Sequence, residues 1–253
     1  MMMKRIFFVV LLGLFLTNFV YSQAAPAPLP LPKVTIGIDK AQKPEDVSLT
    51  LQILLIMTIL SLAPALMILM TSFTRIIIVF HFLKQAMGTQ QVPPSQVIIG
   101  LAIFMTFVIM APVFKDANDN ALQPYLKNQI TQDSAYTRAI KPFRDFMFKQ
   151  TKEEDLALFI KYSGGEKPEN RENISTLTLI PAFALSELRT GFQMGFLLFI
   201  PFLMIDMIVA SILMSMGMMM LPPVFVSLPF KILLFVLVDG WYLIVDTLIK
   251  SFI

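Results

Sequence analysis

The 253-residue sequence contains no cysteine, only one histidine and few charged side chains. Without cysteine the chain can form no disulfide, thiolate nucleophile or cysteine-ligated metal site. A single histidine, His81, cannot by itself form a site with several histidine ligands. Charged residues make up 15% of the chain, against about 25% in typical soluble domains. Because 56% of the residues are apolar, the composition indicates a membrane protein.

Enzyme and nucleic-acid functions receive no support from the sequence. The HExxH, GxSxG, Walker A and GxGxxG motifs are all absent. The net charge is +3, but Lys4 and Arg5 contribute two positive charges at the N-terminus, and no basic stripe with interleaved aromatic residues is present. We therefore expect a protein that is not an enzyme, needs no cofactor or metal, and does not bind nucleic acid.

The N-terminal 46 residues have the pattern of a targeting segment and a linker. Lys4 and Arg5 precede a largely apolar run of 15 residues, and small side chains follow at positions 22, 24 and 25. This arrangement predicts a secretory signal peptide over residues 1–22, with an uncleaved anchor helix as the alternative. Residues 23–46 contain five prolines and form an expected extended linker.

Residues 47–114 are apolar enough for a first helical hairpin. Two long stretches without charge predict helices over about 48–74 and 96–114, joined by a turn at 88–94. Arg75 and Lys84 then lie in the connection between the helices. By the positive-inside rule this connection faces the cytoplasm.

Residues 115–173 differ from the flanking segments because they carry ten basic and ten acidic side chains. We expect a small, water-exposed helical insert on the periplasmic side. The spacing of Thr151 and Glu154 predicts a capping box at a helix start, and Gly164-Gly165 predicts its end. Pro142 should kink or divide the helix that precedes Thr151.

Residues 174–253 predict a second helical hairpin. Only one charged residue occurs between Thr190 and Phe230, and a continuous helix of this length would be about 60 Å long, twice the thickness of the bilayer core. A turn is therefore expected at Gly217 and Pro222-Pro223, between limbs near 182–213 and 224–250. The second limb contains Lys231 and two aspartates, so it should face protein neighbours or an aqueous lumen.

The first limb holds two glycines and two charges with distinctive spacing. Gly191 and Gly195 are four residues apart and share a helix face, which allows another helix to approach closely, although the pattern is weak by itself. Glu187 and Arg189 are two residues apart and point in different directions. Each is expected to bind a partner on another helix or subunit, or else to lie at a solvated helix end.

Asp206 is the single carboxylate among 41 otherwise uncharged residues. Such a group is costly in an apolar setting unless it is paired or protonated. We expect an ion pair with Arg189 or Lys231 of a neighbouring subunit. The alternatives are a proton relay, a group facing a lumen, and a neutral acid bound to a nearby carbonyl.

Five methionines occur within seven residues around Gly217, at positions Met214, Met216, Met218, Met219 and Met220. Methionine is flexible and polarizable, so a cluster of this kind fits surfaces of variable shape. Repeated around a ring, these loops could close a pore and still yield to a passing chain. The alternative is ordinary apolar filling, since the chain has 18 methionines.

Two long stretches resemble the signatures of the FliP family, the P subunit of the flagellar type III secretion export gate. The first is Pro181–Phe196, and the second runs from Pro201 to Met218 with Asp206 at the position of the family aspartate. The resemblance covers almost the whole chain apart from the linker and the polar insert.

The resemblance implies an all-α, non-enzymatic subunit of a helical cone in the bacterial inner membrane, within the flagellar basal body. Family members are pentameric, assemble with FliQ and FliR, and work with FlhB, FlhA and FliO. Unfolded export substrates pass through the cone, much of which lies on the periplasmic side. By this resemblance the methionine-rich loop would form the gasket of the pore.

An ion-coupled transporter is the alternative function. In that case Asp206 would be the proton carrier, and the protein would act as a monomer or dimer.

Overall fold

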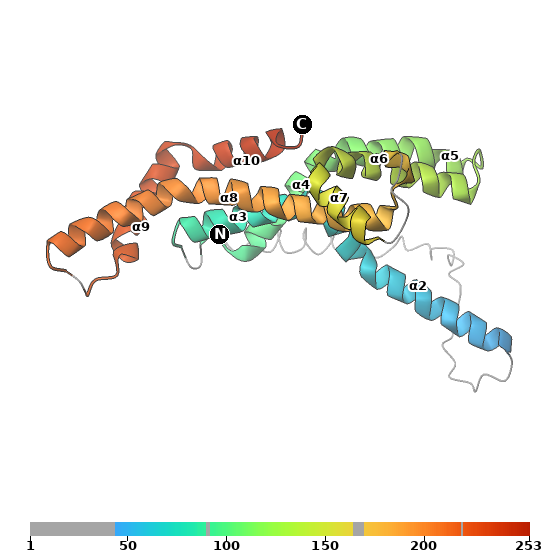
Figure 1. Cartoon of the computed structure of the whole chain (residues 1–253), viewed down its shortest axis with the longest axis horizontal. Coiled ribbons are helices and arrows are strands. Elements are labelled where there is room, and N and C mark those ends of the chain that lie inside the picture. Colours follow the sequence, from blue (N-terminus) through green and yellow to red (C-terminus); the bar gives the residue numbers. More distant parts are fainter. Residues whose placement is uncertain (1–43, 90–91, 164–169, 219) are drawn as a thin grey trace, which may run out of the picture. The chain divides into compact units, whose positions relative to one another are not determined.

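The computed structural model describes residues 44–89, 92–163, 170–218 and 220–253, and all regular elements in these ranges are helices (Figure 1). The all-α prediction is confirmed. The expected signal peptide, most of the expected linker, Gly164-Gly165 and Met219 lie outside the described residues. The chain divides into two units, residues 1–54 and residues 55–253.

The first apolar segment contains three helices instead of the expected two. Helix α2 spans Pro44–Leu69, α3 spans Phe73–Ala86 and α4 spans Ser95–Ala117. The prediction of one helix over 48–74 was therefore wrong, because the hydroxyls of Thr71 and Thr74 both bond the Ile68 carbonyl at the end of α2. Residues 73–86, expected to be a connection, form a helix.

Helix α4 continues into the polar insert through a π-helical turn. That turn spans Asn118–Leu122 and is followed by α5 at Gln123–Leu126. The combined run Ser95–Leu126 is long and apolar enough to cross a membrane. The apolar helix predicted to stop near residue 114 is thus longer than its hydropathy alone indicates.

The described part of the insert continues with α6 at Gln132–Gln150, α7 at Glu153–Tyr162 and a short 3-10 helix at Arg171–Asn173. Pro142 lies inside α6 and does not divide it. The predicted capping box is also wrong, since Lys152 and not Thr151 precedes α7. The Thr151 hydroxyl donates instead to the Met147 carbonyl, 2.6 Å away, and closes α6.

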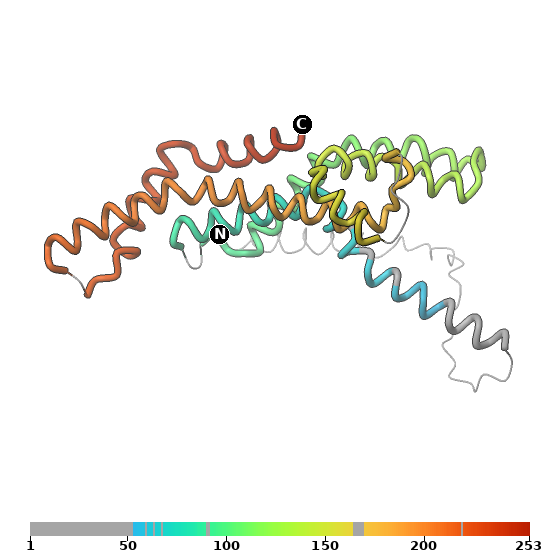
Figure 2. The backbone as a smooth tube through the Cα atoms, in the orientation of Figure 1, coloured from blue at the N-terminus to red at the C-terminus, as the bar shows by residue number. Residues whose placement is uncertain are grey.

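The C-terminal segment is a helical hairpin whose second limb is broken. Helix α8 spans Thr176–Ser215, α9 spans Pro223–Leu237 and α10 spans Gly240–Lys250. The predicted turn between the limbs is confirmed, and Figure 2 shows the chain reversing there. Helices α9 and α10 are bent by 62° at Val238-Asp239, where Asp239 adopts a positive φ of 49°.

Helix α3 is central to the second unit, packing against α4 and along α8 (Figure 1). Its buried side chains, Ile76, Val79, Phe80 and Leu83, recur at helical spacing and form one face. In addition to Ser95–Leu126, α8 is long and apolar enough to cross a membrane, and α9 with α10 makes a third, bent candidate. The core therefore holds α3 beside α8, the helix that contains Glu187, Arg189, Gly191, Gly195 and Asp206.

Candidate functional site

The methionine loop, residues 214–220, lies at the end of the α8–α9 hairpin. Met214, Met216 and Met218 are exposed, and Met220 is 99% exposed. Gly217 has a φ of 77°, and the Met218 amide donates to the Leu213 carbonyl at 3.0 Å. This is a Schellman-type helix end, which glycine favours because it adopts the left-handed conformation without strain. The hairpin thus presents flexible apolar side chains at its end.

Asp206 binds Lys231 within the same chain. The Lys231 ammonium lies 2.6 Å from Asp206 Oδ2, and the Ser227 hydroxyl donates to Asp206 Oδ1. Lys231 is 2% exposed and also donates to the carbonyl of Ala86, the last residue of α3. The carboxylate therefore has a cationic partner from its own hairpin, and pairing of Asp206 across a subunit boundary stays a prediction.

Glu187 forms a fully buried ion pair with Arg75 of α3. Arg75 Nε donates to Glu187 Oε2 at 3.1 Å, and the other nitrogens donate to Gln150 on α6 and to the carbonyl and hydroxyl of Ser251. The guanidinium also lies 3.9 Å from the ring centre of Phe252. Arg75 thus joins α3, α6, α8 and the segment that follows α10.

Arg189 connects α8 to the polar insert. Its guanidinium lies 2.9 Å from Asp155 and 3.2 Å from Glu154, both in the first turn of α7. Asp155 is 1% exposed and accepts a hydrogen bond from Ser186 at 2.7 Å. Glu187 therefore binds a partner on α3 and Arg189 binds partners on α7, in agreement with the expectation that each pairs with another helix.

Gly191 and Gly195 both face α3. A Cβ atom at Gly195 would lie 2.5 Å from the Phe82 ring, and one at Gly191 would lie 3.2 Å from Ile78. Contacts below 3.0 Å require the neighbour to move, so Gly195 is needed for this close approach. The glycine pair lies on α8 between Glu187 and Asp206 and allows α3 and α8 to pack closely there.

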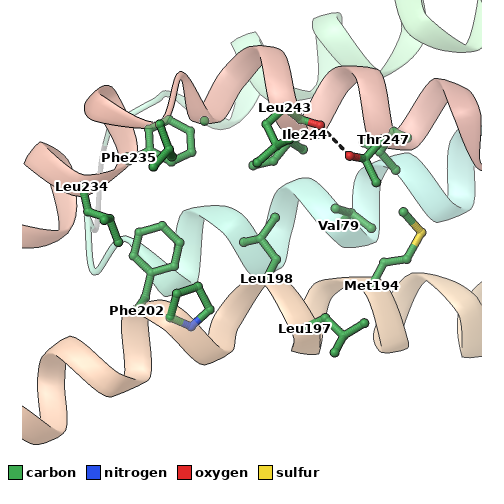
Figure 3. A pocket seen from close by; sticks show the side chains of 14 residues that line it. Val79, Met194, Leu197, Leu198, Phe202, Leu234, Phe235, Leu243, Ile244 and Thr247 are labelled. Atoms are coloured by element: carbon green, nitrogen blue, oxygen red, sulfur yellow. Dashed lines mark hydrogen bonds between the residues drawn. The ribbon is translucent and has the colours of Figure 1, made fainter.

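An apolar groove of about 470 Å³ lies between α8, α10, α3 and the end of α9. Figure 3 shows that Leu198 and Phe202 of α8 point toward the side that holds Ile244 of α10. The Thr247 hydroxyl donates to the Leu243 carbonyl at 2.7 Å, so this polar group already has a partner. The groove offers apolar contact and no charge.

Sequence reasoning missed Arg75, Asp155 and Ser227 as members of these networks. Arg75 was assigned to a connection because it ends a long uncharged run, yet the residues after it repeat at helical spacing, and this signal could have placed it on a helix. Asp155 was indistinguishable from its acidic neighbours in the sequence. Nothing in the sequence around Ser227 indicates its contact with Asp206.

Comparison with known proteins identifies the family. The FliP family model matches residues 56–248. The flagellar biosynthetic protein FliP of Bacillus subtilis is 58% identical over 217 residues, covering 86% of this chain and 98% of the relative. The proteins of the same name from Pectobacterium carotovorum and Borreliella burgdorferi are 49% and 47% identical over 205 and 210 residues, covering 81% and 82% of this chain and 80% and 83% of the relatives. The chain therefore belongs to the FliP family.

Proposed function

We propose that this chain is a pore-forming structural subunit of the flagellar type III protein export gate, through which unfolded flagellar proteins cross the inner membrane. Membership of the FliP family supports the coarser statement that the chain is a membrane component of the flagellar export apparatus, with a structural and transport role. The pore, its seal and its position in the basal body, partly on the periplasmic side, belong to the proposal.

The methionine loop is the observation that carries this proposal. Its described methionines, Met214, Met216, Met218 and Met220, are exposed at the end of a hairpin, where a soluble monomer would be expected to place polar groups. Thioether side chains adapt their shape to a neighbour, and several such loops meeting on an axis would exclude water and ions. A chain crossing the gate would displace the thioether side chains, which are at most weak hydrogen-bond acceptors.

The exposed apolar faces of the hairpin support assembly with other subunits. Large apolar side chains are exposed along the C-terminal half of α8 and along α9, including Phe196, Leu203, Met207, Phe225 and Phe230. Contiguous surfaces of this kind mark lipid or protein contacts. In the proposed gate several copies, five in the family, assemble with FliQ and FliR, with FlhB and FlhA at the cytoplasmic side and FliO assisting assembly.

The seal is tested by replacing all five loop methionines, 214, 216, 218, 219 and 220, with alanine. We expect the complex to assemble but to conduct small ions, measured as dye or ion leakage across membranes that contain it. The matched control replaces Met57 with alanine, an exposed methionine of α2 that lies outside the loop and the hairpin, and should remain tight. Wild-type tightness of the five-alanine variant would remove the sealing role.

A further inference from the structure

Lys231 is a buried cation of α9 that contacts two other helices at once. Its ammonium lies 2.6 Å from Asp206 on α8 and 3.1 Å from the Ala86 carbonyl of α3. Its side chain is only 3% exposed. Because an ammonium has three donors and no acceptor, both bonds can be made together.

The bond to Ala86 satisfies the end of α3. The last four carbonyls of a helix have no partner within that helix, and a cation there also interacts favourably with the helix dipole. Lys231 supplies that cation from α9, more than 140 residues later in the chain. Gly88 lies against the same site, since a Cβ there would be 3.6 Å from Val224 and 3.8 Å from the Lys231 ammonium. The turn after α3 therefore packs on the first turns of α9.

The hydroxyl of Ser227 fixes the carboxylate that Lys231 binds. It lies 2.5 Å from Asp206 Oδ1 and 3.1 Å from the Val224 carbonyl. A hydroxyl has one proton, and a bond to an ionised acceptor is the stronger of the two. Ser227 is fully buried, so water does not compete for this proton. The carboxylate therefore has one oxygen for Lys231 and one for Ser227.

These contacts lie close to the methionine loop. Asp206 is nine residues before the end of α8 and Lys231 is eight residues after the start of α9, or about 12–14 Å from the loop at 1.5 Å per residue. Residues 207–230 contain no other charged side chain. The ion pair of Asp206 with Lys231 is thus the charged contact nearest the loop on both limbs.

We propose that Lys231 is a positioning residue for the methionine loop, which it links to the end of α3 through Asp206 and the Ala86 carbonyl. Displacement of the turn after α3 then displaces the loop, and movement of the loop requires Lys231 to leave Ala86. The inference rests on the proposed function only for the consequence of this movement, which is loss of the seal.

Hydrogen exchange of the full-length chain, purified with the subunits that accompany it, measures the link without relying on the seal. The reporters are amides with assigned bonds, Met216 and Met218 in the loop and Met87 and Gly88 after α3. Lys231→Met removes the charge and both hydrogen bonds but keeps an unbranched side chain of similar length. We expect exchange at both sites to rise roughly tenfold or more, since buried bonds to a charged group are lost.

Two variants serve as controls. Lys231→Arg keeps the charge and the donors and should retain most of the protection. Lys250→Met removes an exposed lysine that pairs with Asp246 on α10, and should leave both sites unchanged. Unchanged loop protection in a folded Lys231→Met chain would overturn the proposal, as would a change confined to Met87 and Gly88.

A disulfide provides a second test that also applies if Lys231→Met folds poorly. The chain has no cysteine, so Gly88→Cys and Val224→Cys introduce the only thiols, at positions in contact. In the Lys231→Met chain, oxidation should restore loop protection and reduction should remove it. The same pair beside an intact Lys231 controls for strain at Gly88, where φ is 72°. Equal exchange in both redox states would contradict the link.

The outcomes separate this inference from the proposed function. If the loop amides respond to Lys231→Met while the five-alanine loop variant stays ion-tight, the positioning role stands and the sealing role fails. If the five-alanine variant leaks and the loop amides do not respond, the sealing role stands and Lys231 does not position the loop.

Discussion

Arg75 and Glu187 form a buried ion pair that joins the start of α3 to α8, 112 residues later in the chain. Neither side chain is more than 3% exposed. The remaining donors of Arg75 bind Gln150 on α6 and Ser251 after α10. This network connects the polar insert, both hairpins and the last residues of the chain.

Replacing Arg75 with methionine leaves the Glu187 carboxylate buried without a counter-charge. Removing one partner of a buried ion pair costs about 3–5 kcal/mol of unfolding free energy. We expect Arg75→Met to lower the midpoint of thermal unfolding of the detergent-purified chain. Arg75→Met combined with Glu187→Leu should recover most of the loss, because no unpaired charge then remains.

Arg171 provides the matched control for this prediction. Its contact with Glu153 spans 3.7 Å, and both side chains are largely exposed. Arg171→Met should therefore leave the unfolding midpoint unchanged. An equal effect of Arg75→Met and Arg171→Met would contradict a structural role for the buried pair.

Alanine at Gly195 should destabilise the chain, because its Cβ would lie 2.5 Å from the Phe82 ring. Gly100→Ala in α4 is the control, since a Cβ atom added at this position would have no neighbouring atom within 4 Å. The substitution Gly100→Ala should stabilise α4 by up to about 1 kcal/mol. Both are measured by thermal unfolding, and stabilisation by Gly195→Ala would refute the close packing of α3 on α8.

Asp155 should hold α7 against α8 through Ser186 and Arg189. We expect Asp155→Ala to release α7 and to increase the rate of proteolytic cleavage within residues 153–162. Glu154→Ala changes a neighbouring carboxylate that is 85% exposed, and should leave the cleavage rate as in the wild type. Equal cleavage of the two variants would show that Asp155 does not attach the insert.

Asp206 distinguishes the export gate from the transporter alternative. Asp206→Ala leaves Lys231 as a buried, unpaired cation, so we expect a lower yield of assembled complex. Adding Lys231→Met should restore stability in part, because both charges are then removed. A transporter would lose ion-coupled transport in Asp206→Asn without any change in oligomer size. The mass of the complex and an ion-flux assay together decide between these results.

Local features of the chain were predictable from the sequence. The turn after α8 was predicted because Gly217 and Pro222-Pro223 interrupt an apolar run too long for one crossing. The family resemblance was likewise confirmed, because the FliP family model matches residues 56–248, which include both signatures.

Long-range partners were not predictable. Residues 73–86 repeat at helical spacing, but Arg75 reaches Glu187 only because α3 packs along α8. Thr151 had the spacing of a helix start but closes the preceding helix, since its hydroxyl donates to the Met147 carbonyl of α6. The partner of Asp206 could be identified only from the folded hairpin, in which Lys231 of the second limb binds it.

The native mass of the complex tests the central claim most directly. The full chain is expressed with its neighbouring genes, extracted in mild detergent and weighed intact. The proposed gate predicts a large particle with several copies of this chain and small hydrophobic partners. A stable monomer or dimer without partners would contradict the account.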